Sequence, residues 1–136
     1  MKRLAAWLFA SPPSPTSTWR VVGWWEVRRI PFNIVIGTYG LLCLVIFFWA
    51  ILTSGQLAPG EDAVEPIGLI FAPLGINVLY TLGWLVEVPA RLIEPRLSPR
   101  FGPFLLMTGL ALGLFLISLP AAFWGTSRIL QMIRVL

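Results

Sequence analysis

Histidine is absent from this chain of 136 residues, and cysteine occurs once, at Cys43. Without histidine the protein lacks the commonest protein metal ligand and the usual general acid–base group of enzymes. A single cysteine cannot close an internal disulfide. Charged residues make up 12% of the chain, about half of the quarter that is typical of soluble domains. We therefore expect no metal ion and no other cofactor, and the low charge argues against a soluble protein.

The chain is rich in apolar residues instead: 57% of it is hydrophobic. Three stretches, 34–52, 67–86 and 104–124, contain no charged side chain. Each is close to the roughly 20 apolar residues that a helix needs to cross a bilayer. The sequence predicts an all-α membrane protein: a domain of three transmembrane helices, 34–124, and a tail, 125–136, that extends the third helix or lies on the membrane surface.

The residues before the first span form a segment of their own, 1–33. Within it, 19–29 (WRVVGWWEVRR) predicts a short helix at the membrane interface, with its arginines toward lipid phosphates. Pro31 favours a turn between this helix and the first span, because the residue before a proline disfavours the α conformation. Residues 1–10 lack the small-residue site that signal-peptide cleavage prefers. We expect them to be an interfacial anchor or a frayed tail.

Lysine and arginine are distributed unevenly around the predicted spans, and cytoplasmic loops are the ones that carry them in excess. The loop between the first two spans contains only acidic charges, Glu61, Asp62 and Glu65. Two basic residues, Arg128 and Arg134, follow the third span. This pattern predicts a cytoplasmic N-terminus and a C-terminus outside, as in a bacterial inner-membrane protein. The other eight of the ten basic residues, all on the predicted cytoplasmic side, are Lys2, Arg3, Arg20, Arg28, Arg29, Arg91, Arg96 and Arg100.

Polar side chains interrupt the second span at helical spacing. Asn77, Tyr80, Trp84 and Glu87 are three, four and three residues apart, which places them on one face of a helix. Asn77 lies near the middle of the span, where an amide needs a hydrogen-bond partner because the lipid offers none. We expect this face to pack against another helix or to line a cavity, with partners for Asn77 on the other spans or on a second copy.

Charged residues also flank the inner ends of the first two spans. Arg28 and Arg29 precede the first span and Glu87 ends the second, so the predicted topology puts them on the same side of the membrane. Asn33 stands at the start of the first span. We predict that Arg28, Arg29, Asn33 and Glu87 form an inner-face cluster joining the two helices. It serves either as a clasp that fixes the topology or as the polar entrance to a small cavity.

Gly109 and Gly113 form a G-x-x-x-G pattern in the third span. Such a pattern lets two helix backbones approach closely. We expect these glycines to mark a helix-packing face, directed toward the other two spans or toward a second copy in a homodimer.

Two stretches of the chain, WWExRRxxFN at 24–33 and NxxYxxGWxxE at 77–87, resemble a group of small bacterial membrane proteins with no assigned activity. The resemblance covers residues 24–87 and implies that the two stretches act together. At the position of Phe32 that group has tyrosine or phenylalanine. We expect tyrosine there, so the phenylalanine of this chain removes a hydroxyl group from the predicted inner cluster.

These features favour a non-enzymatic membrane protein that serves as an accessory subunit, scaffold or assembly partner, in contact with the bilayer and with another membrane protein or further copies of itself. An alternative is a small oligomeric transport or permeation component lined by the Asn77 and Tyr80 face, although the spans lack the intramembrane charges that relay protons or ions. A third hypothesis is an enzyme acting on lipid headgroups through Glu87, for which the sequence offers no nucleophile–base pair. Topology accounts for the net charge of +4, so we expect no nucleic-acid partner.

Overall fold

A computed structural model describes residues 2–12, 17–55, 60 and 66–135. The acidic residues of the predicted first loop, Glu61, Asp62 and Glu65, lie outside the described residues. The elements in the described part of the chain are the helices α1 (Lys2–Leu8), α2 (Thr18–Ser54), α3 (Pro66–Ile93) and α4 (Phe101–Val135).

Among the described residues, three helices are long and apolar enough to cross a membrane: Thr18–Ser54, Ile67–Ile93 and Phe101–Arg134. The prediction of an all-α, multi-pass membrane protein is confirmed. Helices α2 and α4 contain 37 and 35 residues, which correspond to about 50–55 Å at a rise of about 1.5 Å per residue. Because the hydrocarbon core of a bilayer is about 30 Å thick, both helices are long enough to project beyond it.

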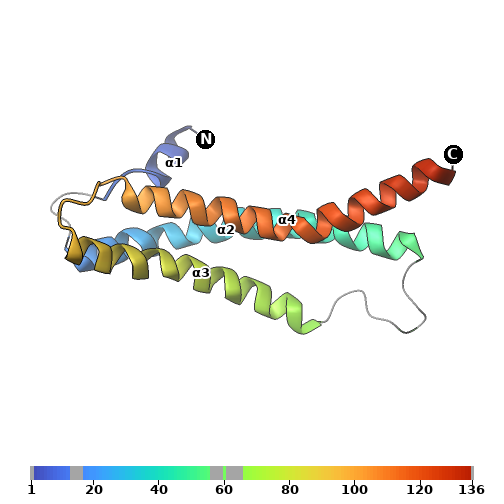
Figure 1. The fold of residues 1–136 in the computed structure, drawn as a ribbon, viewed down its shortest axis with the longest axis horizontal. Helices are drawn as coiled ribbons and strands as arrows, with labels where there is room; N and C mark the ends of the chain where they lie inside the picture. Colours follow the sequence, from blue (N-terminus) through green and yellow to red (C-terminus); the bar gives the residue numbers. More distant parts are fainter. Residues whose placement is uncertain (1, 13–16, 56–59, 61–65, 136) are drawn as a thin grey trace.

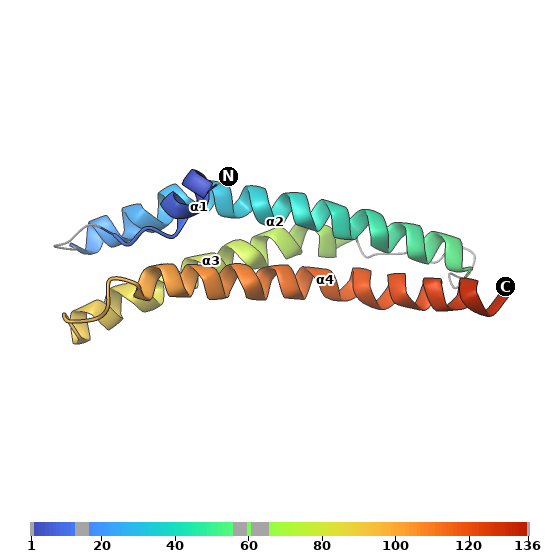
Figure 2. The same cartoon turned by 90° about the horizontal axis from the view of Figure 1, so that it is seen from above.

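Helix α2 runs without interruption through Pro31, so the predicted turn at this proline and the separate helix at 19–29 are wrong. A proline inside a helix removes one backbone hydrogen bond and favours a bend, and α2 is bent in its first half (Figure 2). The helix continues because Trp25 and Phe32, on either side of the proline, both pack on Tyr80 of α3. Their ring centroids lie 5.3 and 4.7 Å from that of Tyr80, and a turn at Pro31 would break one of these contacts.

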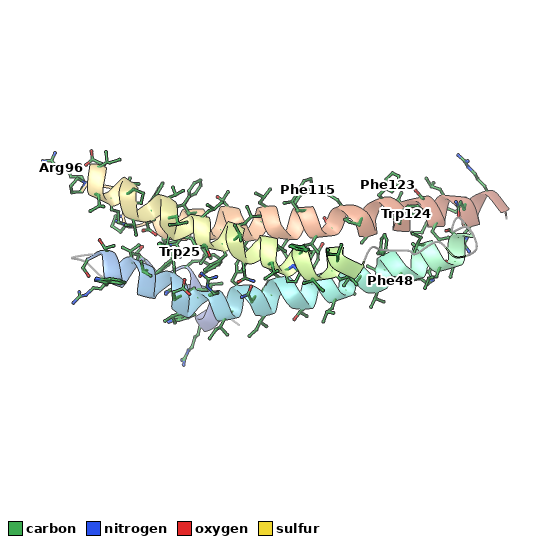
Figure 3. All side chains as sticks on the ribbon, turned by 90° about the horizontal axis from the view of Figure 1, so that it is seen from below. Trp25, Phe48, Arg96, Phe115, Phe123 and Trp124 are labelled. Carbon is green, nitrogen blue, oxygen red and sulfur yellow. The ribbon has the colours of Figure 1, made fainter. Side chains whose placement is uncertain are left out.

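Helices α2 and α4 run in the same direction, and α3 lies antiparallel beside them (Figure 1). Figure 1 also shows that α3 is the shortest of the three, so that the far parts of α2 and α4 extend beyond it. The α3–α4 loop and the start of α2 lie at one end of the bundle, which we call the basic end. Arg96 lies at its tip, whereas Phe123 and Trp124 lie toward the opposite end (Figure 3).

The helix termini follow from local sequence. Helix α2 ends before Gly55, which adopts a left-handed conformation with φ of 66°, as is common for a glycine that follows a helix. Helix α4 has Pro103 in its first turn, where a backbone N–H is not needed. It then continues through Pro120 to Val135. Of the two alternatives for the tail, the structure therefore selects an extension of the third transmembrane helix.

The buried core lies toward the basic end and brings together all four helices. Tyr80 of α3 and Leu106 of α4 pack with side chains from α1 and α2. The large rings of this core lie where α2, α3 and α4 meet, and the candidate site described below lies among them. The buried residues of the core are Leu8, Val21, Trp24, Trp25, Phe32, Ile36, Tyr80 and Leu106.

Candidate functional site

Glu87 of α3 is completely buried, and its carboxylate lies at the junction of the three long helices. The indole Nε1 of Trp25, from α2, donates a hydrogen bond of 2.6 Å to Oε2 of Glu87. Arg91, one turn further along α3, donates from Nε and Nη2 to Oε1 at 2.8 and 2.6 Å. Both carboxylate oxygens are thus satisfied, as a buried charge requires.

Two glycines allow the helices to close around this carboxylate. A Cβ atom at Gly102, near the start of α4, would lie 2.5 Å from Oε2 of Glu87. A Cβ atom at Gly83 of α3 would lie 2.4 Å from the ring of Trp25. Figure 3 places Trp25 between the ribbons of α2 and α3. Only glycine permits both approaches, so the backbones themselves form part of the wall around Glu87.

Tyr80 links the aromatic core to the backbone of α2. Its ring is buried against Trp25 and Phe32, and its hydroxyl donates a hydrogen bond to the backbone carbonyl of Trp25. Trp84, one turn further along α3, is partly buried against the same core. Its Nε1 has no hydrogen-bond partner among the described residues.

A second group of polar side chains, which we call the α2–α3 polar seam, consists of Glu26, Arg29, Asn33, Asn77 and Thr81. Arg29 forms a two-pronged ion pair with Glu26 at 2.7 and 2.8 Å. Its Nη2 also donates to Oγ1 of Thr81 at 3.1 Å, and its Nη1 to Oδ1 of Asn77 at 3.4 Å. Asn33 donates to the same Asn77 oxygen at 3.1 Å. The amide of Asn77 thus receives the partner on α2 that its position requires, and donates in turn to the carbonyl of Pro73 at 3.1 Å.

Arg28 points away from both groups and holds the N-terminal helix. Its guanidinium is buried between the rings of Trp7 and Trp24, 4.6 and 4.1 Å from their centroids. It donates to the carbonyl oxygens of Trp7 and Leu8 at 2.7 and 2.8 Å, which end α1. A cation at the carbonyl end of a helix is electrostatically favourable. The indole of Trp24 adds a hydrogen bond of 2.8 Å to the carbonyl of Ala10.

The inner-face cluster predicted from the sequence is therefore divided in the structure. Arg29 and Asn33 do meet, through Asn77, but Arg28 pairs with the carbonyl groups of α1 and Glu87 pairs with Trp25 and Arg91. This division has a physical reason. Neighbouring residues on a helix point about 100° apart, so Arg28 and Arg29 face different neighbours.

The predicted polar face of α3 is divided in a similar way. Tyr80 and Glu87 are buried in the three-helix junction, whereas Asn77 belongs to the α2–α3 polar seam. Sequence reasoning missed Trp25 as the partner of Glu87 and Gly83 as the position that accommodates its ring. Both residues stand in the two stretches 24–33 and 77–87, but only the three-dimensional register of α2 on α3 pairs them.

The two glycines of the third span behave differently. Gly113 faces α2, where a Cβ atom would lie 3.1 Å from Ile36 Cδ1, whereas a Cβ at Gly109 would meet nothing within 4 Å. Gly113 thus belongs to a helix contact within the chain. Gly109 borders a small cavity of about 30 Å³ that is also lined by Tyr80 and Leu106. A cavity of this volume holds about one water molecule.

The carboxylate at the centre of this site is engaged in contacts within the protein. The oxygens of Glu87 are occupied, and the described residues contain no group of three or more His, Cys, Asp or Glu side chains that could hold a metal ion. Comparisons with protein families, with curated proteins and with solved structures find no match to this chain. Its function must therefore be argued from the geometry itself.

Substituting Gly102 or Gly83 by alanine will destabilise the bundle. The added methyl group meets the Glu87 carboxylate in one case and the rigid Trp25 ring in the other, and such overpacking costs about 1–3 kcal/mol. Gly109→Ala is the matched control, since its methyl group enters open space. Unfolding in mixed detergent micelles, followed by tryptophan fluorescence, measures the free energies; a Gly102→Ala protein as stable as Gly109→Ala would contradict the packing described.

Tyr80→Phe will lower the free energy of unfolding by about 1 kcal/mol, because it deletes a buried hydrogen bond while keeping the ring. Tyr39→Phe provides the comparison, since the Tyr39 hydroxyl has no hydrogen-bond partner among the described residues. The same unfolding titration compares the two variants. Equal stability of both would show that the Tyr80 hydroxyl contributes nothing.

Arg28→Lys will loosen α1 from α2. Lysine keeps the positive charge but loses the planar fork that reaches the carbonyls of Trp7 and Leu8 together. Hydrogen–deuterium exchange should become faster at the amides of α1 and remain unchanged in α3. Arg96→Lys, at an exposed loop position, is the control and should change neither; unchanged exchange in the Arg28 variant would refute the clasp.

Proposed function

We propose that this chain is a small, non-enzymatic integral membrane protein that serves as an accessory subunit or assembly partner of another membrane protein. The observation that carries the proposal is that the far end of α4 is long and exposes apolar side chains. If Gly102 lies near one bilayer boundary, about 20 residues of helix reach the other boundary near Trp124. Helix α4 continues from there to Val135.

The projecting part of α4 exposes several large apolar side chains. Ile129, Leu130, Met132 and Ile133 are each 47–61% exposed, at positions that this placement of Gly102 puts beyond the hydrocarbon core. Exposed apolar clusters outside the bilayer are costly in water and typical of protein interfaces. We infer that a partner protein covers this surface.

We further propose that the basic end faces the cytoplasm of a bacterial cell and that α4 projects on the outer side. The α3–α4 loop contributes Arg96 and Arg100 to the basic end, both exposed. An excess of arginine and lysine is typical of cytoplasmic segments.

The alternative of a permeation component has less support. A pathway along the Asn77 and Tyr80 face needs an open channel, whereas the cavity beside Tyr80 has a volume of about 30 Å³. The hydroxyl of Tyr80 is already bonded to the backbone of α2, and Asn77 is bonded to Asn33. These groups hold helices together instead of lining a path.

Crosslinking in native membranes, followed by extraction in mild detergent and native mass spectrometry, tests the proposal. We expect a complex that contains a second kind of protein. The double variant Ile129→Ser, Ile133→Ser should lower the yield of this complex roughly fivefold or more, as loss of about 1 kcal/mol or more of apolar contact implies.

The double variant Leu92→Ser, Ile93→Ser is the control, because these residues are also highly exposed but lie at the basic end. It should leave the complex intact. A monomer in crosslinked membranes would refute the accessory role, and a complex made only of copies of this chain would favour the permeation alternative.

A further inference from the structure

The α2–α3 polar seam has hydrogen-bonding capacity that the protein does not use. Arg29 and Glu26 form an ion pair, but their side chains remain 26% and 45% exposed. Asn33, further along α2, donates one amide hydrogen to Asn77. Its second amide hydrogen and its carbonyl oxygen have no partner among the described residues. The seam therefore presents a positive charge, a negative charge and an amide to its surroundings.

The seam begins at the last charged residue of α2 and continues into the apolar part of the bundle. On α2, Arg29 is the last charged residue, and none follows up to Ser54. On α3, no charged residue stands between Ile67 and Glu87. From the basic end inward, the two helices present an ion pair, then amides, then exposed apolar side chains such as Ile34 and Leu74.

This order matches the order of chemical groups in a glycerophospholipid, which places a charged headgroup above ester groups and acyl chains. We propose that the α2–α3 polar seam binds a lipid with a phosphoethanolamine headgroup, taken from the leaflet at the basic end. Arg29 donates to the phosphate, Glu26 accepts from the ammonium group, and the amide of Asn33 donates to an ester oxygen. The acyl chains lie along the apolar residues beyond.

The paired charges determine the choice of headgroup. A site built of arginine alone favours any anionic lipid, whereas Arg29 beside Glu26 is neutral in sum and complements a zwitterion. A primary ammonium donates charge-assisted hydrogen bonds to a carboxylate. The methylated ammonium of choline has no N–H to donate, and the glycerol of phosphatidylglycerol brings no cation to Glu26. Phosphatidylethanolamine is therefore preferred over both.

Native mass spectrometry of the full chain tests the proposal. The protein is exchanged into mixed micelles with equal amounts of phosphatidylethanolamine, phosphatidylcholine and phosphatidylglycerol that have identical acyl chains, and the lipid retained per chain is counted. We expect one retained phosphatidylethanolamine, preferred over phosphatidylcholine by roughly fivefold or more, the size expected of one charge-assisted hydrogen bond. Equal retention of the two, or stronger retention of phosphatidylglycerol, would overturn the proposal.

Three variants assign the preference to the seam. Glu26→Gln should abolish the preference for ethanolamine over choline, and Arg29→Lys should weaken retention of both lipids. Arg100→Gln, which removes an exposed charge from the α3–α4 loop, should change nothing; a loss of preference there would show that general surface charge is responsible and overturn the site. Thermal unfolding verifies the fold, and if the Arg29 variant does not fold, Glu26→Gln decides alone, because that carboxylate is exposed.

A competition experiment distinguishes binding of the whole lipid from binding of its headgroup alone. Soluble phosphoethanolamine lacks the acyl chains that lie along α2 and α3 in the proposed site. At a concentration equal to that of the lipid it should not displace bound phosphatidylethanolamine, and displacement would refute the assignment to a lipid.

Discussion

The fold depends on one constraint, which is that the buried carboxylate of Glu87 must have partners. A charge removed from water is tolerated only when it is paired and hydrogen-bonded, and loss of one partner of a buried pair costs roughly 3–5 kcal/mol. Here the partners come from α2 through Trp25 and from α3 through Arg91, while α4 closes the site at Gly102. A single side chain therefore sets the position of three helices relative to one another. Apolar packing alone is less specific, because lipid tails are as apolar as the helix surfaces.

The same constraint explains why the two ends of the bundle differ. Around Glu87 the helices are held by directed hydrogen bonds and by rings that pack on Tyr80. Toward the opposite end α3 no longer accompanies α2 and α4 (Figure 1), and a hydrogen bond of 3.1 Å from Arg128 to Thr53 joins the remaining pair. The basic end is thus a junction of three helices joined by directed contacts, whereas the far end is a two-helix surface on which the proposed partner can pack.

Hydropathy predicted the three transmembrane helices because the requirement for apolar residues at membrane depth is local in the sequence. The partners of the polar residues were not predictable in this way, since they depend on how far each helix is rotated about its axis. Arg28 and Arg29 are adjacent in the chain, yet one holds α1 and the other joins the α2–α3 polar seam. The prediction at Pro31 failed for a related reason: the local preference for a turn is weaker than the packing of Trp25 and Phe32 on a single ring of α3.

Three arginines near the basic end have three different kinds of partner, and this bears on the proposed orientation. Arg28 meets backbone carbonyls between two indole rings, Arg29 meets Glu26, and Arg91 meets Glu87. If these three arginines are left out of the count that sets the orientation, seven basic residues remain. Five of these, Lys2, Arg3, Arg20, Arg96 and Arg100, precede the first span or stand in the α3–α4 loop, against Arg128 and Arg134 in the last part of α4. Because orientation follows the count of arginine and lysine and hardly depends on acidic residues, the proposed cytoplasmic N-terminus does not rest on the charges that hold the fold together.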